Sequence, residues 1–443
     1  MIRKLYMNIY FTDLLGVFRN TSVKVETTKN LNIKVMFDGS SVYGFSDISY
    51  SDFYLIPLMN KVFKIPWAED VIGCIAGVYT PELNRHSYDP RFILEKTINY
   101  LKEKGYEAIV GVEMEFFILK NIEYSISNNK QFLEIVSEES SKDLIIPFRQ
   151  GYHLIESLDK VAPIRRKIMD YLAEAGFHTV KNHHEVASNG QVEITSESMD
   201  PLDLGDFIQV FKFFAKKIAA LNDHVAVFIP KPFPWDNGSG MHIHVSLWKD
   251  GKNIFYDPSG EKNLSKYAKY FIGGLIKHGR GLSAIVSPTI NSYRRLVPGY
   301  EAPILLTWGY GNRSTAVRVP LVNNSPDKIR IEYRPPDPTA NPYLALSAIL
   351  LAGLDGIEKR IDPGEPLKIN AYKLSPEEIR RRGIEYIPSS LSEALNELEN
   401  DNDYLRQIWG KEVIEKYIEL KRKEIKILQP IPSPAEFLYY NVL

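Results

Sequence analysis

Four short stretches alternate apolar and polar residues so strictly that each is predicted to be a β-strand. The clearest is 241–247, in which every second residue is apolar and the others are two histidines and a serine. The same pattern recurs at 111–117, 191–195 and 328–334. Because side chains of a strand point alternately to two faces, each stretch has one face for a core and one polar face. These polar faces hold mainly Glu, His and Arg instead of the Lys, Ser and Thr of an ordinary solvated face.

The remaining pattern predicts a strand-rich first part and a helix-rich second part. Residues 1 to about 85 are predicted to form short strands and turns, with a strand pair at 9–11 and 17–19. Residues 121–142 are rich in Ser, Asn, Lys and Glu, and we expect a surface excursion and the one candidate for disorder. Apolar residues at helical spacing predict helices at 91–104, 162–176, 201–226, 264–282 and 343–354, with charged surface helices over 370–425.

Composition narrows the class of protein. The chain has 443 residues, enough for more than one domain, and its 54 basic and 55 acidic residues give a formal net charge of -1. This balance offers no electrostatic case for nucleic acid or for an anionic membrane. One cysteine, Cys74, excludes an intrachain disulfide. With no signal-type apolar core and no run of about 18 apolar residues, the expected compartment is the cytoplasm.

The polar faces of the four strands supply the candidate chemistry. Carboxylates with one imidazole suit Mg²⁺ or Mn²⁺, which prefer oxygen ligands. Arginines nearby suit a phosphate or carboxylate that the metals also hold. We therefore expect a metal-filled cavity lined by strand faces that binds an anionic substrate. The adjacent triplet His183, His184 and Glu185 fits either metal ligation or a polar turn.

Missing motifs exclude several enzyme classes. The chain has no Walker-type lysine loop, no GxGxxG after a strand and no serine elbow, which disfavours a P-loop ATPase, a Rossmann dehydrogenase and a serine hydrolase. Two classes remain: a metal-dependent phosphoryl-transfer or ligase enzyme, and a structural or regulatory protein on the same scaffold. The enzyme is favoured, because an unused buried carboxylate cluster would be costly to keep.

Longer motifs then point to a family. Taken in order over about residues 8–425, they resemble those of type I glutamine synthetases. They are FDGSS at 37–41, GVEMEFF at 111–117, HHEVA at 183–187, NGSGMHIH at 237–244, NSYRRLVPGYEAP at 291–303, NRS at 312–314 and RIEYRPPDP at 330–338.

The resemblance implies an α+β fold with two domains. Residues 1–85 would be a small N-terminal β-grasp domain, and 86–443 a large catalytic domain with a strand-lined metal cavity and a C-terminal helical tail. It also implies a homo-oligomer, a dodecamer of two stacked hexameric rings with active sites between neighbouring subunits. Asp38 and Ser41 would reach into the next subunit's cavity.

The implied reaction joins ammonia to the glutamate side chain in two steps. ATP phosphorylates the carboxylate to γ-glutamyl phosphate, and ammonia then displaces phosphate. Two or more Mg²⁺ or Mn²⁺ ions would act in each site. The alternatives left open are a γ-glutamyl ligase for another amine and a non-catalytic paralogue.

The resemblance also assigns roles to individual residues. Catalysis would fall to Asp38, Glu301 and Arg313, with Glu301 on a flap. One metal would be held by Glu115, Glu185 and Glu193, and the second by Glu113, His242 and Glu332. Glutamate and ammonium would be bound by Ser41, Tyr152, Asn237, Gly238, Arg295 and Arg334, and ATP by His244, Ser246, Arg313 and Arg318.

Some positions depart from the family pattern. The usual N-terminal helix is expected to be missing or very short. Leu58 replaces an expected Asp, and Asp47 replaces the Arg of feedback-inhibited members. The Pro-rich stretch 429–443 could alter the assembly. Tyr372 lies near a position modified in some bacterial members, but its surroundings differ and we expect a plain surface tyrosine.

Overall fold

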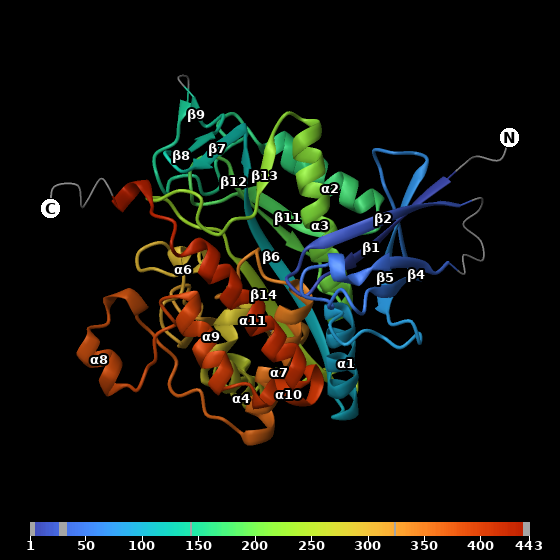
Figure 1. Cartoon of the computed structure of the whole chain (residues 1–443). Helices are drawn as coiled ribbons and strands as arrows, with labels where there is room; N and C mark the ends of the chain where they lie inside the picture. Colours follow the sequence, from blue (N-terminus) through green and yellow to red (C-terminus); the bar gives the residue numbers. More distant parts are fainter. Residues whose placement is uncertain (1–4, 26–32, 142–143, 323–324, 437–443) are drawn as a thin grey trace.

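The first part of the chain forms a five-stranded sheet. A computed structural model describes residues 5–25, 33–141, 144–322 and 325–436. The sheet lies at the right of Figure 1 in the order β2-β1-β5-β4-β3, with the central pair β1 and β5 parallel. The predicted strand pair is confirmed, because β1 and β2 are antiparallel and Thr12 opposes Phe18. The strands are β1 Leu5–Thr12, β2 Phe18–Val25, β3 Val35–Asp38, β4 Asp52–Lys64 and β5 Val71–Tyr79.

A second sheet contains all four of the alternating stretches, each of which was predicted to be a strand. Its order is β11-β12-β6-β14-β18-β17-β16, with β13 beside β6 and β15 beside β14. The stretch predicted at 328–334 is regular only in β18, because a 3-10 turn at Pro326–Lys328 precedes it. The strands are β6 Glu107–Leu119, β11 Thr179–His184, β12 Gln191–Ser196, β13 Val225–Val227, β14 Met241–Lys249, β15 Lys252–Asn253, β16 Trp308–Tyr310, β17 Val317–Val319 and β18 Ile331–Tyr333.

Strand register gathers the polar faces on one side of this sheet. His242 opposes Glu113, and Glu193 opposes Glu115. His244 opposes Glu332 on the next strand. Residues directly opposite in an antiparallel pair share a face, so the acidic and histidine side chains form one row across five strands.

The apolar face of the same sheet is covered by helices. The ring of Phe116 on β6 meets that of Phe211 on α3 edge to face at 5.6 Å between centroids. α3 is shorter than predicted and ends at Leu221, where Asp223 has a left-handed backbone with φ 56°. The helices of this part are α1 Pro90–Glu103, α2 Ala162–Glu174, α3 Pro201–Leu221, α4 Lys266–Lys277, α5 Gly279–Val286, α6 Ser292–Arg295 and α7 Pro342–Lys359.

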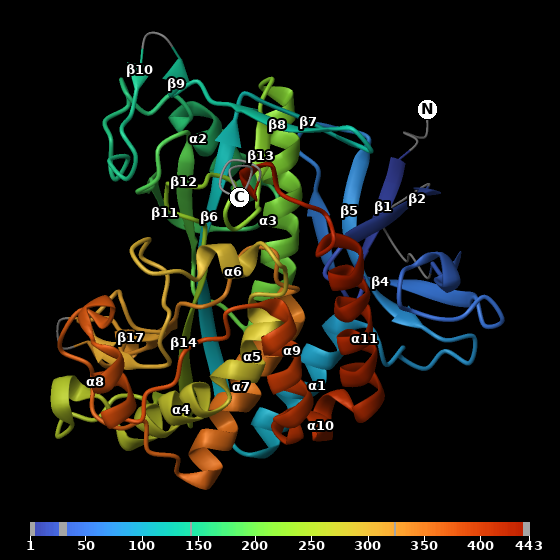
Figure 2. The ribbon, with the colours of Figure 1, turned by 60° about the vertical axis from the view of Figure 1, so that its left-hand side comes forward.

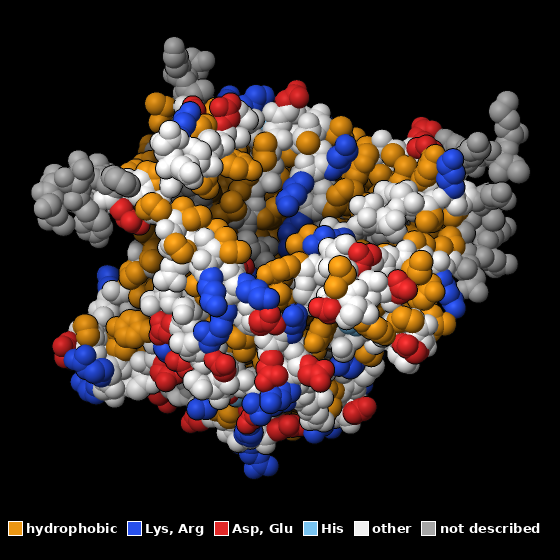
Figure 3. Space-filling model, viewed as in Figure 1, with side chains coloured by type: hydrophobic (Ala, Val, Ile, Leu, Met, Phe, Trp, Pro, Cys, Tyr) orange, Lys and Arg blue, Asp and Glu red, His pale blue; other side chains and the backbone are white. Residues whose placement is uncertain are grey.

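The C-terminal helices are only partly a surface layer, which corrects the sequence-based expectation. Leu395, Leu405 and Trp409 are buried, and the Trp409 indole donates to Ser347 Oγ on α7 at 2.7 Å. Figure 2 shows the last three of these helices beside α1 and α7. Their outer side carries interspersed charges of both signs, as the lower half of Figure 3 shows. They are α8 Pro376–Arg381, α9 Leu391–Asn400, α10 Asp403–Trp409 and α11 Lys411–Leu428.

Residues 121–141 of the predicted excursion are described, and because they include regular strands, the prediction of disorder is wrong for them. β7 Asn121–Ser127 and β8 Lys130–Val136 pair as an antiparallel hairpin. Two short strands, β9 Ser140–Ser141 and β10 Leu144–Ile145, follow it. The apolar side chains of Tyr124 and Leu133 are exposed, which agrees with the predicted surface position.

Two expectations about the termini fall partly or wholly outside the described residues. They concern the N-terminal helix and the tail at 429–443, of which 429–436 are described. In the described part of the chain, no helix is both long and apolar enough to span a bilayer. Cys74 is fully buried in the first sheet.

The predicted helix at 264–282 is broken at His278, which joins three elements. Its Nδ1 lies 2.8 Å from Asp401 Oδ2 beyond α9, and its Nε2 lies 3.0 Å from Asp355 Oδ2 on α7. The ring stacks on Tyr404 at 4.1 Å between centroids. Burial opposes the charged form, but the two carboxylates prevail and raise the pKa of His278.

This arrangement predicts a pH-dependent stability. A histidine whose pKa is raised by folding stabilises the fold fully below its unfolded pKa, and the contribution is lost as pH rises through the folded pKa. His278→Gln should therefore lower the free energy of unfolding by about 2 kcal/mol at pH 6 and by less at pH 9. Denaturant melts at both pH values measure this, with exposed His178→Gln as the control. Equal losses at pH 6 and pH 9 would contradict the ion-pair role.

Candidate active site

One predicted set of three side chains converges on the polar face of the second sheet. Glu113, His242 and Glu332 each place one ligand atom within 4.8 Å of the others. His242 Nδ1 lies 3.3 Å from Glu113 Oε2 and 4.0 Å from Glu332 Oε1. All three come from adjacent strands, so register alone brings them together.

A second group lies one strand further along and includes His183, for which the sequence left metal ligation and a polar turn both open. Its members are His183, Glu185 and Glu193, again within 4.8 Å of one another. His183 Nε2 is buried and lies 3.2 Å from Glu193 Oε1 without forming a hydrogen bond. His183 opposes Glu193 in register, so the strand pattern of Thr179–His184 could have revealed it.

Glu115, predicted with Glu185 and Glu193, lies between the two groups. Its Oε1 is 3.7 Å from His242 Nδ1, while its Oε2 accepts from the Gly240 backbone N–H at 2.6 Å. Burial raises the pKa of Glu185, and the charges of Glu115 and Glu193 raise it further. Such mutual repulsion is what a bound cation would relieve.

Arginines compensate the buried charge at the other end of the row. Arg318 and Arg334 both bind the carboxylate of Glu332, which is fully buried. Burial would raise the pKa of Glu332, but Arg334 and the two strand histidines lower it to about 2. Glu332 is therefore ionised at neutral pH.

The two acidic groups border an open cavity of about 320 Å³. Most of the residues predicted to bind substrate line this cavity. The polar side chains that line it come from β6, β12 and β14 and from loops. The predicted residues among them are Glu115, Tyr152, Glu185, Asn237, Gly238, His242, Arg295, Glu301, Arg313 and Arg334.

The loop 298–303, which we call the flap loop, closes one side of this cavity. Its Glu301 has a left-handed backbone with φ 59°, a conformation that costs a non-glycine residue free energy. Arg334 donates to the carbonyl of Glu301 at 3.3 Å, and Arg149 donates to that of Gly299 at 3.1 Å. These contacts hold the flap loop against the cavity wall.

Tyr372 is not the plain surface residue expected from the sequence. Its hydroxyl donates to the carbonyl of Ala302 in the flap loop at 2.7 Å. Burial raises the pKa of Tyr372 to about 12, so the hydroxyl keeps its proton at neutral pH. Tyr372 lies in the 3-10 turn Ala371–Lys373 and therefore anchors the flap loop to that turn.

Arg295 lies under the cavity and not at its mouth. Its guanidinium is buried and donates to the carbonyls of Pro335 and Arg334 at 2.8 and 3.1 Å. It thus fixes the chain after β18 and presents a positive charge to the cavity at the same time. Burial lowers the pKa of Arg295, which does not remove its charge at neutral pH.

The residues predicted to bind ATP fall into two places. His244 Nε2 lies 3.1 Å from Glu113 Oε1, and Ser246 follows it two residues along β14. Ser246 Oγ accepts from the Trp248 indole at 3.0 Å. Arg313, by contrast, is exposed on the loop before β17 and belongs to the cavity rim.

Two positively charged side chains at the site were not predicted from the sequence to be functional. Arg330 donates to His244 Nδ1 at 3.1 Å, which orients that imidazole toward Glu113. The ammonium of Lys231 lies 3.7 Å from the centre of the Tyr300 ring in the flap loop. Burial lowers the pKa of Lys231 to about 8. Arg330 belongs to the motif at 330–338 but was given no role, and no motif marks Lys231, whose neighbour Tyr300 is distant in sequence.

Asp38 and Ser41 are not brought to this cavity within one chain. Both are exposed in the first domain, where Asp38 caps the 3-10 turn Gly39–Ser41. Asp38 accepts from the hydroxyls of Ser40 and Ser41, each at 2.6 Å, and these bonds lower its pKa. Asp38 is thus a fixed, ionised carboxylate that faces outward.

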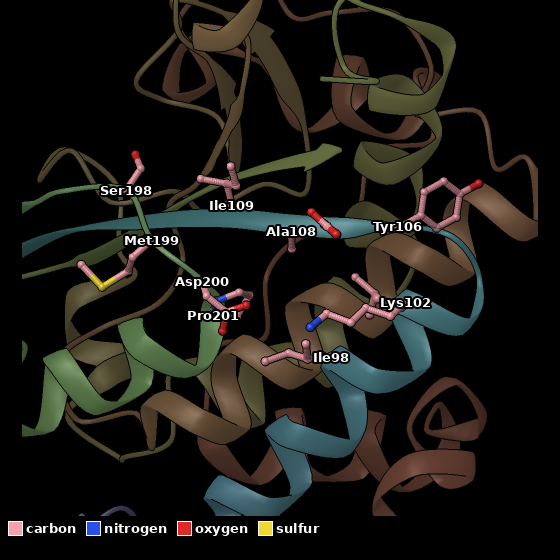
Figure 4. Close-up of a pocket in the computed structure, with 11 residues that line it drawn as sticks. Ile98, Lys102, Tyr106, Ala108, Ile109, Ser198, Met199, Asp200 and Pro201 are labelled. Carbon is pink, nitrogen blue, oxygen red and sulfur yellow. The ribbon is translucent and has the colours of Figure 1, made fainter. Parts of the chain in front are cut away.

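A separate hollow of about 320 Å³ lies near the start of β6 (Figure 4). Ile98 and Lys102 of α1 line it together with Met199 and Asp200 before α3. None of the residues predicted to be functional is among its lining residues. The chemistry therefore concentrates in the strand-lined cavity.

The two-sheet fold and the cavity of carboxylates, histidines and arginines define a class of protein: a ligase that couples ATP to bond formation. Two family profiles cover almost the whole chain. The profile described as "Glutamine synthetase, beta-Grasp domain" matches residues 4–81, and "Glutamine synthetase, catalytic domain" matches 87–440. The chain belongs to the glutamine synthetase family, and its activity is the ATP-dependent formation of glutamine. The predicted family and α+β fold are confirmed.

Individual relatives agree over nearly their full length. The glutamine synthetase of Sulfolobus acidocaldarius is 43% identical over 98% of this chain and 95% of the relative. That of Aquifex aeolicus is 40% identical over 99% and 96%. Among solved structures, Plasmodium falciparum glutamine synthetase covers 99% of this chain with a TM-score of 0.88 at 28% identity, and 96% of that structure is matched. A GmaS complex with ADP has a TM-score of 0.85 at 30% identity and matches 100% of this chain and 98% of its own.

Proposed function

We propose that the strand-lined cavity is the catalytic centre, and that its residues act in the roles given below. The observation that carries this proposal is the single row of Glu, His and Arg across the second sheet, beside a cavity closed by the flap loop. The first step needs positive charge around the phosphates of ATP. The second step needs water to be excluded from the acyl phosphate.

Divalent cations fit the residues of the row. Glu113, His242 and Glu332 would hold one ion, and Glu115, Glu185 and Glu193 a second, with His183 as a further donor. The buried and unpartnered Nε2 of His183, together with carboxylates that repel one another, suits such a ligand set. When bound, Mg²⁺ or Mn²⁺ neutralises the phosphate charge of ATP.

The first step forms the acyl phosphate. Arg295, Asn237 and Gly238 would position glutamate, while Arg313, Arg318, His244 and Ser246 would bind the nucleotide and its phosphates. A side-chain carboxylate oxygen of glutamate attacks the γ-phosphorus of ATP, and the bond to the bridging oxygen breaks to release ADP. Arg334 would also hold glutamate, and Arg313 would stabilise the charge of the transferring phosphoryl group. The ADP bound to a structural relative supports a nucleotide site.

The second step releases phosphate. Ammonium loses a proton to a carboxylate, for which Glu301 and the neighbour's Asp38 are proposed, with Tyr152 beside them. Ammonia then attacks the acyl carbon, the bond from that carbon to the phosphate oxygen breaks, and the nitrogen gives its surplus proton to the departing phosphate. The flap loop keeps water away from the acyl phosphate during this step. The compartment that fits these substrates is the cytoplasm.

A comparison of amines tests the acceptor. ATP-dependent phosphate release in the presence of glutamate should be fast with ammonium and slow with methylamine, ethanolamine and polyamines. Mass analysis of the product should find glutamine. Faster release with any of the other amines, with the matching γ-glutamyl amide as product, would overturn the choice of ammonia.

The exposed position of Asp38 supports a shared active site in a ring-shaped oligomer, proposed here as two stacked hexamers. Asp38→Ala and Glu332→Ala chains should each be inactive alone. Mixed in equal amounts within one oligomer, they should recover about one quarter of parental activity, because one interface in four joins an intact cavity to an intact Asp38. Different affinity tags on the two chains, both retained through sequential purification, verify that the oligomers have mixed. Verified mixed oligomers without any recovery would exclude shared sites.

A further inference from the structure

A buried carboxylate stands behind the proposed metal ligand Glu185. Glu139 follows the exposed hairpin β7–β8, yet it is only 1% exposed. The turn at Ser137 directs it inward, since Ser137 Oγ accepts from the Glu139 N–H at 3.2 Å. Its neighbour Glu138 keeps 38% of its side chain exposed. A fully buried glutamate requires compensating partners.

Glu139 has three such partners, each from a different segment. Its Oε2 accepts from His184 Nε2 at 2.9 Å and from the backbone N–H of Gly190. Its Oε1 accepts from the backbone N–H of Lys160, just before α2, at 3.2 Å. One carboxylate thus ties both ends of the loop 185–190 to the start of α2.

His184 links Glu139 to the proposed metal ligand Glu185. Its other ring nitrogen, Nδ1, donates to the carbonyl of Glu185 at 2.7 Å. The Glu185 side chain then accepts from the N–H of Val186 at 2.6 Å. Gly151 packs directly on this contact: a Cβ there would lie 2.5 Å from both the Glu185 carbonyl oxygen and His184 Cε1. The backbone of Glu185 is therefore held by the His184–Glu139 pair, with Gly151 packed against the His184–Glu185 contact.

We propose that Glu139 is a positioning residue that, through His184, holds the backbone of Glu185 so that its carboxylate faces His183 and Glu193. The inference rests on the proposed metal role of Glu185. Partners behind metal ligands orient them, and their loss typically reduces metal affinity about 10- to 100-fold. The Glu139 side chain touches neither substrate nor metal in this arrangement.

Binding of Mn²⁺ to the metal-free full-length protein tests this without requiring turnover. Free Mn²⁺ is counted by electron paramagnetic resonance in a titration. We expect Glu139→Gln to weaken the affinity of one class of sites by about tenfold or more. Glu138→Gln, at the adjacent exposed position, should leave the affinity unchanged. In assays, Glu139→Gln should raise the Mn²⁺ concentration for half-maximal rate more than it lowers kcat.

A double-mutant cycle checks that the effect passes through His184. His184→Gln should weaken Mn²⁺ binding to the same extent, and the double variant should bind no more weakly than either single one. His184→Gln also carries the test if Glu139→Gln does not fold. Affinity within twofold of the parent in the Glu139 or His184 variant would overturn the proposal, as would additive losses.

Failure here is distinguishable from failure of the proposed function. A parent that binds Mn²⁺ but makes no glutamine would refute the reaction and leave the Glu139 comparison standing. A parent that makes glutamine, with a Glu139→Gln variant that binds Mn²⁺ equally well, would refute only the positioning role.

Discussion

Glu185→Gln should abolish glutamine formation, with a loss of about 1,000-fold or more, while making the metal-free protein more stable. The substitution keeps the shape and the hydrogen bond from Val186 but removes a charge that the site needs for a cation. Burial and the charges of Glu115 and Glu193 raise the pKa of Glu185. A carboxyl with a raised folded pKa destabilises the fold above its unfolded pKa, so its removal stabilises the fold at neutral pH.

Glu193→Gln is the matched comparison. Burial alone would raise the pKa of Glu193, but the nearby His183 ring, 3.2 Å away, and the charge of Lys181 lower it overall, so this carboxylate stabilises the fold at neutral pH. Both variants should be inactive, yet the metal-free melting temperature should rise for Glu185→Gln and fall for Glu193→Gln. Calorimetry in the presence of a chelator measures the difference. Parental turnover in either variant, or equal melting shifts, would contradict the proposed cavity.

Glu301→Ala should uncouple the two steps. Glutamate-dependent ATP cleavage should persist, while the glutamine formed per ATP should fall about 100-fold, because the acyl phosphate would be lost to water. Alanine keeps a left-handed backbone about as unfavourable as glutamate does, so the flap loop itself should change little. Phosphate and glutamine counted in the same reaction give the ratio.

Two controls sharpen the experiment on Glu301. Glu365→Ala removes an exposed glutamate from another loop and should leave the ratio at one glutamine per phosphate. Glu301→Gln keeps the size of the side chain but cannot accept a proton, and it should behave as Glu301→Ala. Parental glutamine formation with no excess phosphate would show that the flap carboxylate has no such role.

The chain's own pattern was enough to predict the acidic row, because strand alternation is local. Glu113 and Glu115 occupy one face of one strand, and His242 and His244 one face of another, whatever surrounds them. Register decided which of them meet, and register depends on the packing of the whole sheet. Even so, the predicted group of Glu113, His242 and Glu332 forms.

The site features that the sequence did not predict depend on contacts between segments that are distant along the chain. Glu139 sits in a polar stretch and is buried only because the hairpin returns the chain toward His184. Tyr372 was predicted to be a plain surface residue because its hydrogen-bond partner, the carbonyl of Ala302, is 70 residues away in the sequence. His183 fitted either metal ligation or a polar turn, because no strand was predicted at 179–184 that would fix the face of its side chain.

One measurement tests most directly whether this cavity makes glutamine through an acyl phosphate. Glutamate labelled with ¹⁸O in its side-chain carboxylate is incubated with ATP, ammonium and Mg²⁺, and the released phosphate is analysed by mass spectrometry. Each phosphate formed with glutamine should carry one labelled oxygen, because the attacking carboxylate oxygen leaves with the phosphorus. Unlabelled phosphate, formed in step with glutamine, would contradict the proposed chemistry.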